Sequence, residues 1–197
     1  GLKSQIISKT YTVELAVPSA PEVFAQSGEY TSPTMIEILE FEDVTVYYTS
    51  DGTFPSEQST LYRGPIPMPL GKSVFRFVGY NEDGVAGEIT QREFYLTLNT
   101  ELTTDTACYD IIKKMMETGK ISDTIGTAVG LNGWYKYQFQ YPVTVEGHGD
   151  FYVIAELFQD ITGNREKTGT YYGVNILDRN IYKLSQDESG NYLLEGF

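Results

Sequence analysis

Several residue types that catalytic and metal centres commonly use are nearly absent from this chain. Its 197 residues include one cysteine, Cys108, and one histidine, His148. A single cysteine excludes an internal disulfide and a metal cluster held by cysteines. It does not by itself indicate a redox compartment. Because Cys108 falls on the apolar side of a predicted helix, we expect it to be a buried small side chain.

Positive charge and long apolar runs are scarce as well. The chain has 14 Lys and Arg against 27 Asp and Glu, which gives a formal net charge of −13. Such a surface repels phosphate backbones and anionic lipid, so no nucleic-acid partner is expected. The sequence has no run of 18 apolar residues, so no transmembrane segment is predicted. It begins Gly1-Leu2-Lys3 and shows no signal peptide, and we expect any targeting segment or anchor to lie outside it.

Aromatic residues, by contrast, are abundant. The chain has 16 Tyr and 10 Phe, and most Tyr lie in alternating runs that favour strands. From residue 23 to residue 98, short runs of this kind are separated by turn signals, such as Asp51-Gly52 after the run 44–49. Short strands with a turn about every 8–12 residues, and no amphipathic helix, predict an immunoglobulin-like antiparallel β-sandwich.

The periodicity changes after residue 100. Five apolar residues between Cys108 and Met116 follow the spacing of one helical face. Thr104 or Asp105 is expected to cap the start of this helix, and Gly119 suits a left-handed end. We therefore place a domain boundary near residue 100.

A sheet is expected to follow the helix. Apolar residues occupy every second position from Tyr135 to Val145, which predicts one apolar face and one largely wet face. Further strands are expected at 151–158, 171–177, 181–184 and 191–194, with a tight turn at 178–180. One helix packed on an antiparallel meander is the simplest assembly.

The resulting fold prediction is a mostly β chain with two domains. An immunoglobulin-like sandwich is expected over residues 18–100 and an α+β domain over residues 101–197. Residues 4–15 resemble residues 87–98, the last strand of the sandwich, at a distance of about one such domain. Residues 1–17 are therefore interpreted as a strand left from a preceding sandwich repeat. Alternatively, two alternating strands simply look alike, and residues 4–15 supply an edge strand of this sandwich.

Two motifs in the first half carry a family resemblance. Tyr48-Thr49-Ser50-Asp51-Gly52 is followed by Tyr62-Arg63-Gly64-Pro65-Ile66. With the segments 21–24 and 27–30 and the strand around Phe94, they make residues 18–98 resemble the β-sandwich domain at the C-terminus of chitobiases and β-hexosaminidases, also described as a fibronectin-type-III-associated module. The resemblance implies an accessory module of secreted or surface bacterial proteins, without catalytic residues. Phe54 and the pair Gly79-Tyr80 depart from the usual pattern.

The second half resembles no single family closely. The layout of residues 105–197 is similar to the helix-plus-sheet domains of bacterial lipoproteins, including cystatin-like and PepSY-like folds. The strand–turn–strand element at 173–182 is the clearest shared feature. A similarity at the level of fold implies no function.

Candidate catalytic and metal sites are weak. His148 lies between Glu146 and Asp150, so a catalytic pair or a metal site would need one of these carboxylates. The sequence has no Gly-x-Ser-x-Gly elbow and no calcium-binding loop. The acidic clusters at 40–43 and 187–188 are expected by chance in so acidic a chain. We therefore predict a polar loop at His148, and no catalytic residue, metal ligand or cofactor.

An aromatic surface is the best candidate for ligand binding. Trp134, the single tryptophan, lies at the start of a strand and on the opposite face from Tyr135. Sugars stack on exposed rings of this kind. Tyr171, Tyr172 and Tyr182 are expected to extend the surface. The alternative is that these rings line the core between helix and sheet.

These observations favour a non-catalytic accessory region of a larger secreted or cell-surface bacterial protein, serving adhesion, spacing or glycan contact. The expected partner is a glycan or a surface protein. A second hypothesis is a protein-binding or inhibitor-like α+β domain that acts on a surface partner, which an exposed apolar patch on the free face of the sheet would favour. A third is a hydrolase, which requires a deep pocket that joins His148 to an acid and which a fully exposed His148 would contradict.

Overall fold

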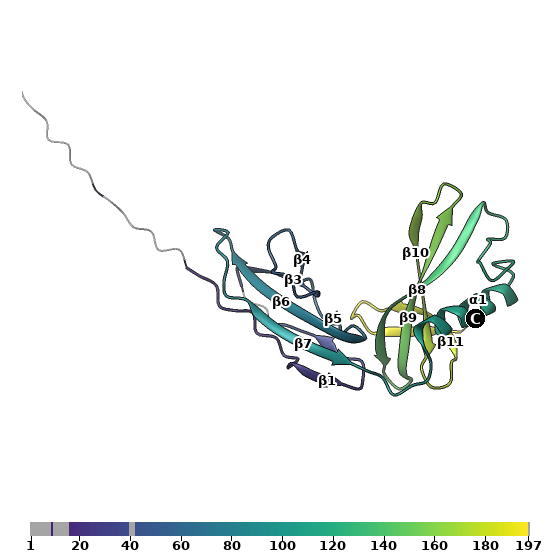
Figure 1. Cartoon of the computed structure of the whole chain (residues 1–197), viewed down its shortest axis with the longest axis horizontal. Helices are drawn as coiled ribbons and strands as arrows, with labels where there is room; N and C mark the ends of the chain where they lie inside the picture. Colours follow the sequence, from purple (N-terminus) through teal and green to yellow (C-terminus); the bar gives the residue numbers. More distant parts are fainter. Residues whose placement is uncertain (1–8, 10–15, 40–41, 197) are drawn as a thin grey trace, which may run out of the picture.

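The computed structural model describes residue 9, residues 16–39 and residues 42–196. Its two lobes, a β-sandwich and a helix packed on a second sheet, lie side by side along the long axis of the molecule (Figure 1). The predicted fold class, mostly β with two domains, is confirmed. The interpretation of residues 1–17 as a repeat remnant falls almost entirely outside the described residues. It stays a prediction, as do the domain limits at 18, 100 and 197.

The first domain consists of a five-stranded sheet and a two-stranded sheet. The larger sheet has the order β1 (Gly28–Tyr30), β7 (Thr90–Leu96), β6 (Gly71–Asn81), β3 (Val44–Thr49) and β4 (Thr60–Leu61), and the smaller one pairs β2 (Met35–Ile36) with β5 (Ile66–Pro67). All neighbours are antiparallel except β1 and β7, which run parallel. Phe75, Phe77 and Phe94 fill the space between the sheets with Ile36 and Met68.

The motif residues have structural roles in this sandwich. Gly52 has a φ of +80°, and the Asp51 carboxylate accepts a hydrogen bond of 3.0 Å from the amide of Thr53. The hydroxyl of Tyr62 accepts a bond of 3.3 Å from the backbone amide of Ile38. The first contact stabilises the tight turn that the sequence predicts at Asp51-Gly52. The second gives the polar end of a packed tyrosine ring a backbone partner.

The helix, α1 (Thr104–Glu117), follows the sandwich. Its buried residues are Ala107, Ile111 and Met115, with Cys108 partly buried beside them. The cap prediction is wrong by one position. Thr103, not Thr104 or Asp105, is the N-cap, because its hydroxyl accepts the amide of Thr106 at 3.1 Å. The left-handed end at Gly119, with a φ of +75°, is confirmed.

The second sheet is an antiparallel meander. Its strands are β8 (Gly133–Val145), β9 (Gly149–Asp160), β10 (Arg165–Asn175), β11 (Ile181–Gln186) and β12 (Tyr192–Glu195), and their order in the sheet follows the sequence. The expected turn at 178–180 is present, with Arg179 in the left-handed region at a φ of +62°. Strand β10 starts at Arg165, well before the expected Tyr171.

The predicted faces of β8 are wrong, because the strand contains a β-bulge. Phe139 lies opposite Ile154 of β9, and Tyr141 lies opposite Val153, so Gln140 is an extra residue. One extra residue reverses the alternation of faces for everything that follows it. Tyr135, Tyr137 and Phe139 therefore pack towards the helix, whereas Tyr141, Val143 and Val145 pack on the opposite face.

The central strand β9 is buried on both faces. Tyr152 and Ile154 face the helix core, whereas Phe151 and Val153 belong to a second core on the other face. A second bulge, in β10, lies beside the same stretch, since residues 168–170 lie opposite the single residue 156. Side chains from the two edge strands reach each other over the second core, since the hydroxyl of Tyr192 on β12 lies 3.3 Å from that of Tyr141 on β8.

The two domains share hydrophobic residues. Leu70 and Leu98 pack against both the sandwich core and the helix–sheet core. The connecting segment is also anchored by the hydroxyl of Thr100, which donates a hydrogen bond of 2.6 Å to the carbonyl of Ile176. These contacts tie the linker to both lobes.

The N-cap assignment predicts a selective loss of stability. Thr103→Ala removes the acceptor for the Thr106 amide and should lower the free energy of unfolding by about 1 kcal/mol. Thr104→Ala, the same change one residue later, should have a smaller effect. Urea unfolding followed by circular dichroism measures both, and a greater loss for Thr104→Ala would contradict the assignment.

Candidate functional site

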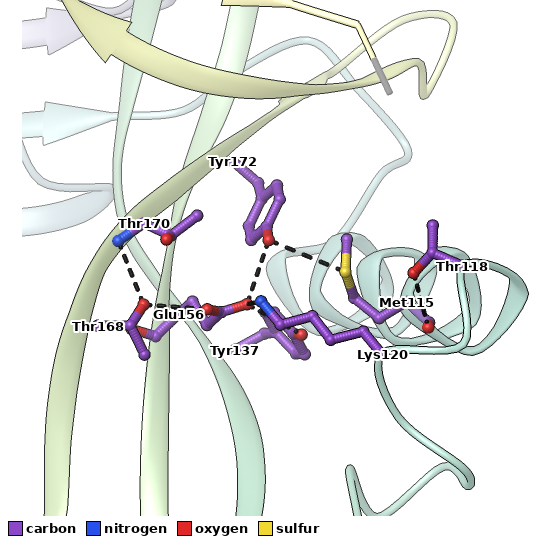
Figure 2. A network of polar contacts seen from close by, with 8 residues as sticks. All are labelled: Met115, Thr118, Lys120, Tyr137, Glu156, Thr168, Thr170 and Tyr172. Atoms are coloured by element: carbon purple, nitrogen blue, oxygen red, sulfur yellow. Dashed lines mark hydrogen bonds and ion pairs between the residues drawn. The ribbon is translucent and has the colours of Figure 1, made fainter. Parts of the chain in front are cut away.

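A buried carboxylate, Glu156, lies at the centre of the second domain. Only 2% of its surface is exposed. One carboxylate oxygen accepts bonds from Lys120 Nζ at 2.5 Å, the Tyr172 hydroxyl at 3.1 Å and the Tyr137 hydroxyl at 3.3 Å. The other oxygen accepts the Thr168 hydroxyl at 3.0 Å. Figure 2 shows these groups converging on Glu156 of β9 from the two neighbouring strands, β8 and β10, and from the segment that follows the helix.

This network has the character of a structural support. A buried carboxylate is costly unless it is paired and hydrogen-bonded, and here a cation and three hydroxyls satisfy it. Lys120 also lies 4.4 Å from the centre of the Tyr135 ring, which stabilises its charge further. The bonds join β8, β9, β10 and the end of the helix at one point. Sequence reasoning missed Glu156, although a single acid in an otherwise apolar strand was a signal for it.

The tyrosines of this network are held in their neutral form. Burial raises the pKa of Tyr137 and of Tyr172, and the negative charge of Glu156 raises both further. Each hydroxyl therefore remains a hydrogen-bond donor to the carboxylate. The arrangement provides no free base and no open position for a substrate.

The opposite face of the sheet carries a cavity of about 380 Å³. The rings of Tyr141, Tyr171 and Tyr192 line it, and Val153 and Leu184 belong to the core beneath them. We call it the tyrosine cavity. The bulge in β8 turns Tyr141 to this face, and the bulge in β10 immediately precedes Tyr171.

The polar groups of the tyrosine cavity are uncharged. Besides the tyrosine hydroxyls, Gly169, Ser185 and Gln186 line it, and none of the described lining residues carries a charge. Burial raises the pKa of Tyr192, as does its hydrogen bond to Tyr141. The cavity therefore combines aromatic rings with neutral hydrogen-bonding groups.

Three of the four predicted ligand-binding rings share the face of this cavity. Trp134, Tyr171 and Tyr182 lie on it because directly paired residues of neighbouring strands share a face. Tyr171 lines the cavity, and the ring of Tyr182 packs edge-on against Phe151 in the core beneath. Tyr172 points to the other face, where it is buried beside Glu156. Ligand binding by these rings stays a prediction.

Trp134 lies on the same face but towards the other end of β8. It is partly exposed and pairs with Gln159, whereas Tyr171 pairs with Ala155 four residues along β9. At about 3.3 Å per residue, this places Trp134 roughly 13 Å from the cavity along the strand direction. In the same region, Lys167 donates a hydrogen bond of 2.8 Å to the side chain of Gln140, the extra residue of the β8 bulge.

The remaining candidates do not form a reactive site. His148 is exposed in the turn between β8 and β9, and its Nδ1 lies 3.0 Å from the carbonyl of Glu146. Burial raises the pKa of the Cys108 thiol, which disfavours the reactive thiolate. Among the described residues, no three His, Cys, Asp or Glu side chains gather as metal ligands. No helix within these residues is long and apolar enough to cross a membrane.

Comparison with known proteins gives one family match, within the first domain. Residues 25–91 match the family model of the chitobiase/beta-hexosaminidase C-terminal domain, which confirms the resemblance. No curated protein sequence matches the chain significantly.

Two solved structures from Bacteroides are distantly similar. One is SGBP-B of the Bacteroides ovatus mixed-linkage glucan utilization locus, solved with a mixed-linkage heptasaccharide. It has 10% identity and a TM-score of 0.28, over 91% of this chain and 62% of that chain. The other is a quinonprotein alcohol dehydrogenase-like protein from Bacteroides thetaiotaomicron, with 8% identity and a TM-score of 0.23, over 89% of this chain and 50% of that one. The chain thus spans less than two thirds of either protein.

The Glu156–Lys120 pair predicts strong coupling between two substitutions. Lys120→Met leaves a buried carboxylate without its cation and should cost roughly 3 kcal/mol of unfolding free energy. Glu156→Gln together with Lys120→Met should cost less than the sum of the single changes. Lys113→Met, at an exposed ion pair with Asp110, serves as the control with a loss of about 0–1 kcal/mol. Additive losses in urea unfolding would show that the pair is not coupled.

The buried tyrosines predict a loss of stability at alkaline pH. Below the ordinary tyrosine pKa of 10, folded and unfolded chains both keep these protons, so the contribution to stability is complete. Above pH 10 the unfolded chain releases them first, and stability should fall as pH rises. Ultraviolet titration should show Tyr137 and Tyr172 ionising only on unfolding. In Glu156→Gln they should ionise at lower pH, and identical titrations would refute the role of the carboxylate.

Proposed function

We propose that the chain is a non-catalytic accessory region of a larger secreted or cell-surface bacterial protein, and that it contacts glycan through its second domain. The observation that carries the proposal is the match of residues 25–91 to a domain of chitobiases and β-hexosaminidases, which act on glycans. The aromatic face that bears Trp134 and Tyr171 supports the contact, because sugars stack on rings of this kind.

The hydrolase hypothesis fails the condition set for it. It required a deep pocket that joins His148 to an acid, and His148 is exposed in a turn. Glu156, the most deeply buried acid, is fully engaged by donors. Neither residue offers general acid or base chemistry to a bound substrate.

Protein binding is the second candidate function. Ile125, Val129 and Leu131 lie exposed in the segment between α1 and β8. Neighbouring exposed aliphatic side chains of this kind favour contact with a protein surface. A partner that this segment binds should be lost when the three residues are replaced by serine, and the glycan contact should persist.

Location at the cell surface is part of the proposal. A full-length gene product with a signal peptide, a lipobox or a wall anchor, and with a further sandwich upstream, would support both the location and the repeat interpretation. A cytoplasmic parent protein with neither would overturn them.

The proposal predicts retention by polysaccharide. The chain should be slowed in affinity electrophoresis through gels that contain at least one of a panel of neutral plant, fungal or bacterial polysaccharides. Trp134→Ala removes a partly exposed ring and should weaken this retention, whereas Tyr109→Ala on the helix should leave it unchanged. Migration that no polysaccharide alters would overturn glycan contact and leave spacing or protein contact.

A further inference from the structure

The tyrosine cavity depends on two β-bulges, which a five-stranded meander does not need. An uninterrupted meander would turn Tyr141 towards the helix, and only the extra residue Gln140 brings it to the cavity. The bulge at 168–170 places Gly169, with a φ of +82°, at the rim beside Tyr171. Bulges of this kind re-aim side chains and are over-represented next to binding sites.

The curl of the sheet gives the cavity its walls. Tyr192 comes from the last strand and Tyr141 from the first, and their hydroxyls lie 3.3 Å apart across the concave face. Leu184 and Val153 close the floor. The volume of about 380 Å³ is at the lower end of the range for small-molecule sites, which is roughly 300–1,000 Å³. The cavity is therefore suited to a small ligand or to one end of a longer one.

The chemistry of the lining selects the ligand class. The rings of Tyr141, Tyr171 and Tyr192 offer flat apolar faces, and the hydroxyls with Ser185 and Gln186 offer neutral donors and acceptors. A ligand that satisfies both has an apolar face and several hydroxyl groups at its edge. A pyranose sugar has this distribution of groups.

Charge disfavours the anionic alternatives. None of the described lining residues is a cation that would pair with a carboxylate or sulfate. The chain as a whole has a net charge of −13, which repels anionic ligands. Lys167 lies outside the lining, engaged with Gln140 and 6.0 Å from the centre of the Tyr171 ring.

From this geometry we infer that the tyrosine cavity binds one uncharged pyranose residue of a glycan, stacked against Tyr171 and hydrogen-bonded by Tyr141 and Tyr192. This inference rests on the proposed glycan contact and adds its place and ligand class. The rest of the saccharide extends along the same face towards Trp134, which provides a second, separate ring. Trp134 therefore contributes to long saccharides and not to short ones.

The test uses the whole chain and two independent measurements. Amide chemical shifts in NMR spectra are followed during titration with glucose, galactose, mannose and N-acetylglucosamine, with disaccharides of each, and with glucuronic and galacturonic acid. Calorimetry then measures the affinity of the best neutral ligand for Tyr171→Ala, Tyr192→Phe, Trp134→Ala and the control Tyr109→Ala. Thermal unfolding verifies that each variant is folded.

A cavity site gives a defined set of results. A neutral saccharide shifts the amides around Tyr141, Tyr171 and Tyr192, and Tyr171→Ala weakens its binding about tenfold or more, equivalent to about 1.4 kcal/mol. Tyr192→Phe, which removes one hydroxyl, weakens binding by about three- to tenfold. Trp134→Ala and Tyr109→Ala leave the affinity for a disaccharide unchanged.

Other results overturn the inference in distinguishable ways. Shifts confined to Trp134 and its neighbours, with polysaccharide retention that Tyr171→Ala does not change, reject the cavity and leave the proposed glycan contact standing. Uronic acids that bind as tightly as neutral sugars reject the ligand class. The absence of binding to every saccharide, short or long, rejects the inference and the proposed function together. If Tyr171→Ala does not fold, the shift map of the natural chain and Tyr192→Phe decide the result.

Discussion

The second domain depends on a central strand that is buried on both faces. From Phe151 to Leu157 every residue of β9 is buried, with Tyr152 and Ile154 in the helix core and Phe151 and Val153 in the core on the other face. A single helix can cover only one face of a sheet, so the other face needs a different cover. The sheet supplies part of it from its own edge strands, whose Tyr141 and Tyr192 side chains reach each other over that face. The bulges in β8 and β10, beside the middle of β9, permit this curvature.

The same strand carries the one fully buried acid among the described residues, Glu156. It lies opposite the bulge in β10, where the backbone ladder is interrupted and side chains take over part of the bonding. Lys120 reaches it from the segment after the helix, so the carboxylate joins the helix end to the sheet at its most irregular point. The Glu156 network thus lies on the helix side of the sheet, and the tyrosine cavity on the other side.

The helix and most strands could be predicted from the sequence, whereas the contacts between residues far apart in the chain could not. Motif residues such as Asp51 and Gly52 identified the sandwich because the turn needs those residue types locally. The stripe around Ile111 identified the helix for the same reason. The apolar alternation from Tyr135 to Val145 is the same whether or not one of its residues is unpaired. The change of sheet face at Gln140 therefore could not be predicted from the sequence. The contacts of Glu156 with Lys120 and of Tyr141 with Tyr192 join residues far apart in the chain, and no local pattern encodes them.

Leu70 and Leu98 give the connection between the domains a mechanical property. Each side chain is shared by two cores, so turning one lobe against the other would uncover apolar surface on both sides, at about 25 cal/mol for each Å². The Thr100–Ile176 hydrogen bond holds the linker to the second lobe. The shared side chains therefore oppose rotation of one lobe against the other. The face of the second lobe that bears the tyrosine cavity therefore keeps a fixed orientation relative to the sandwich. In an array of such sandwiches, the orientation of that face would be set by the array.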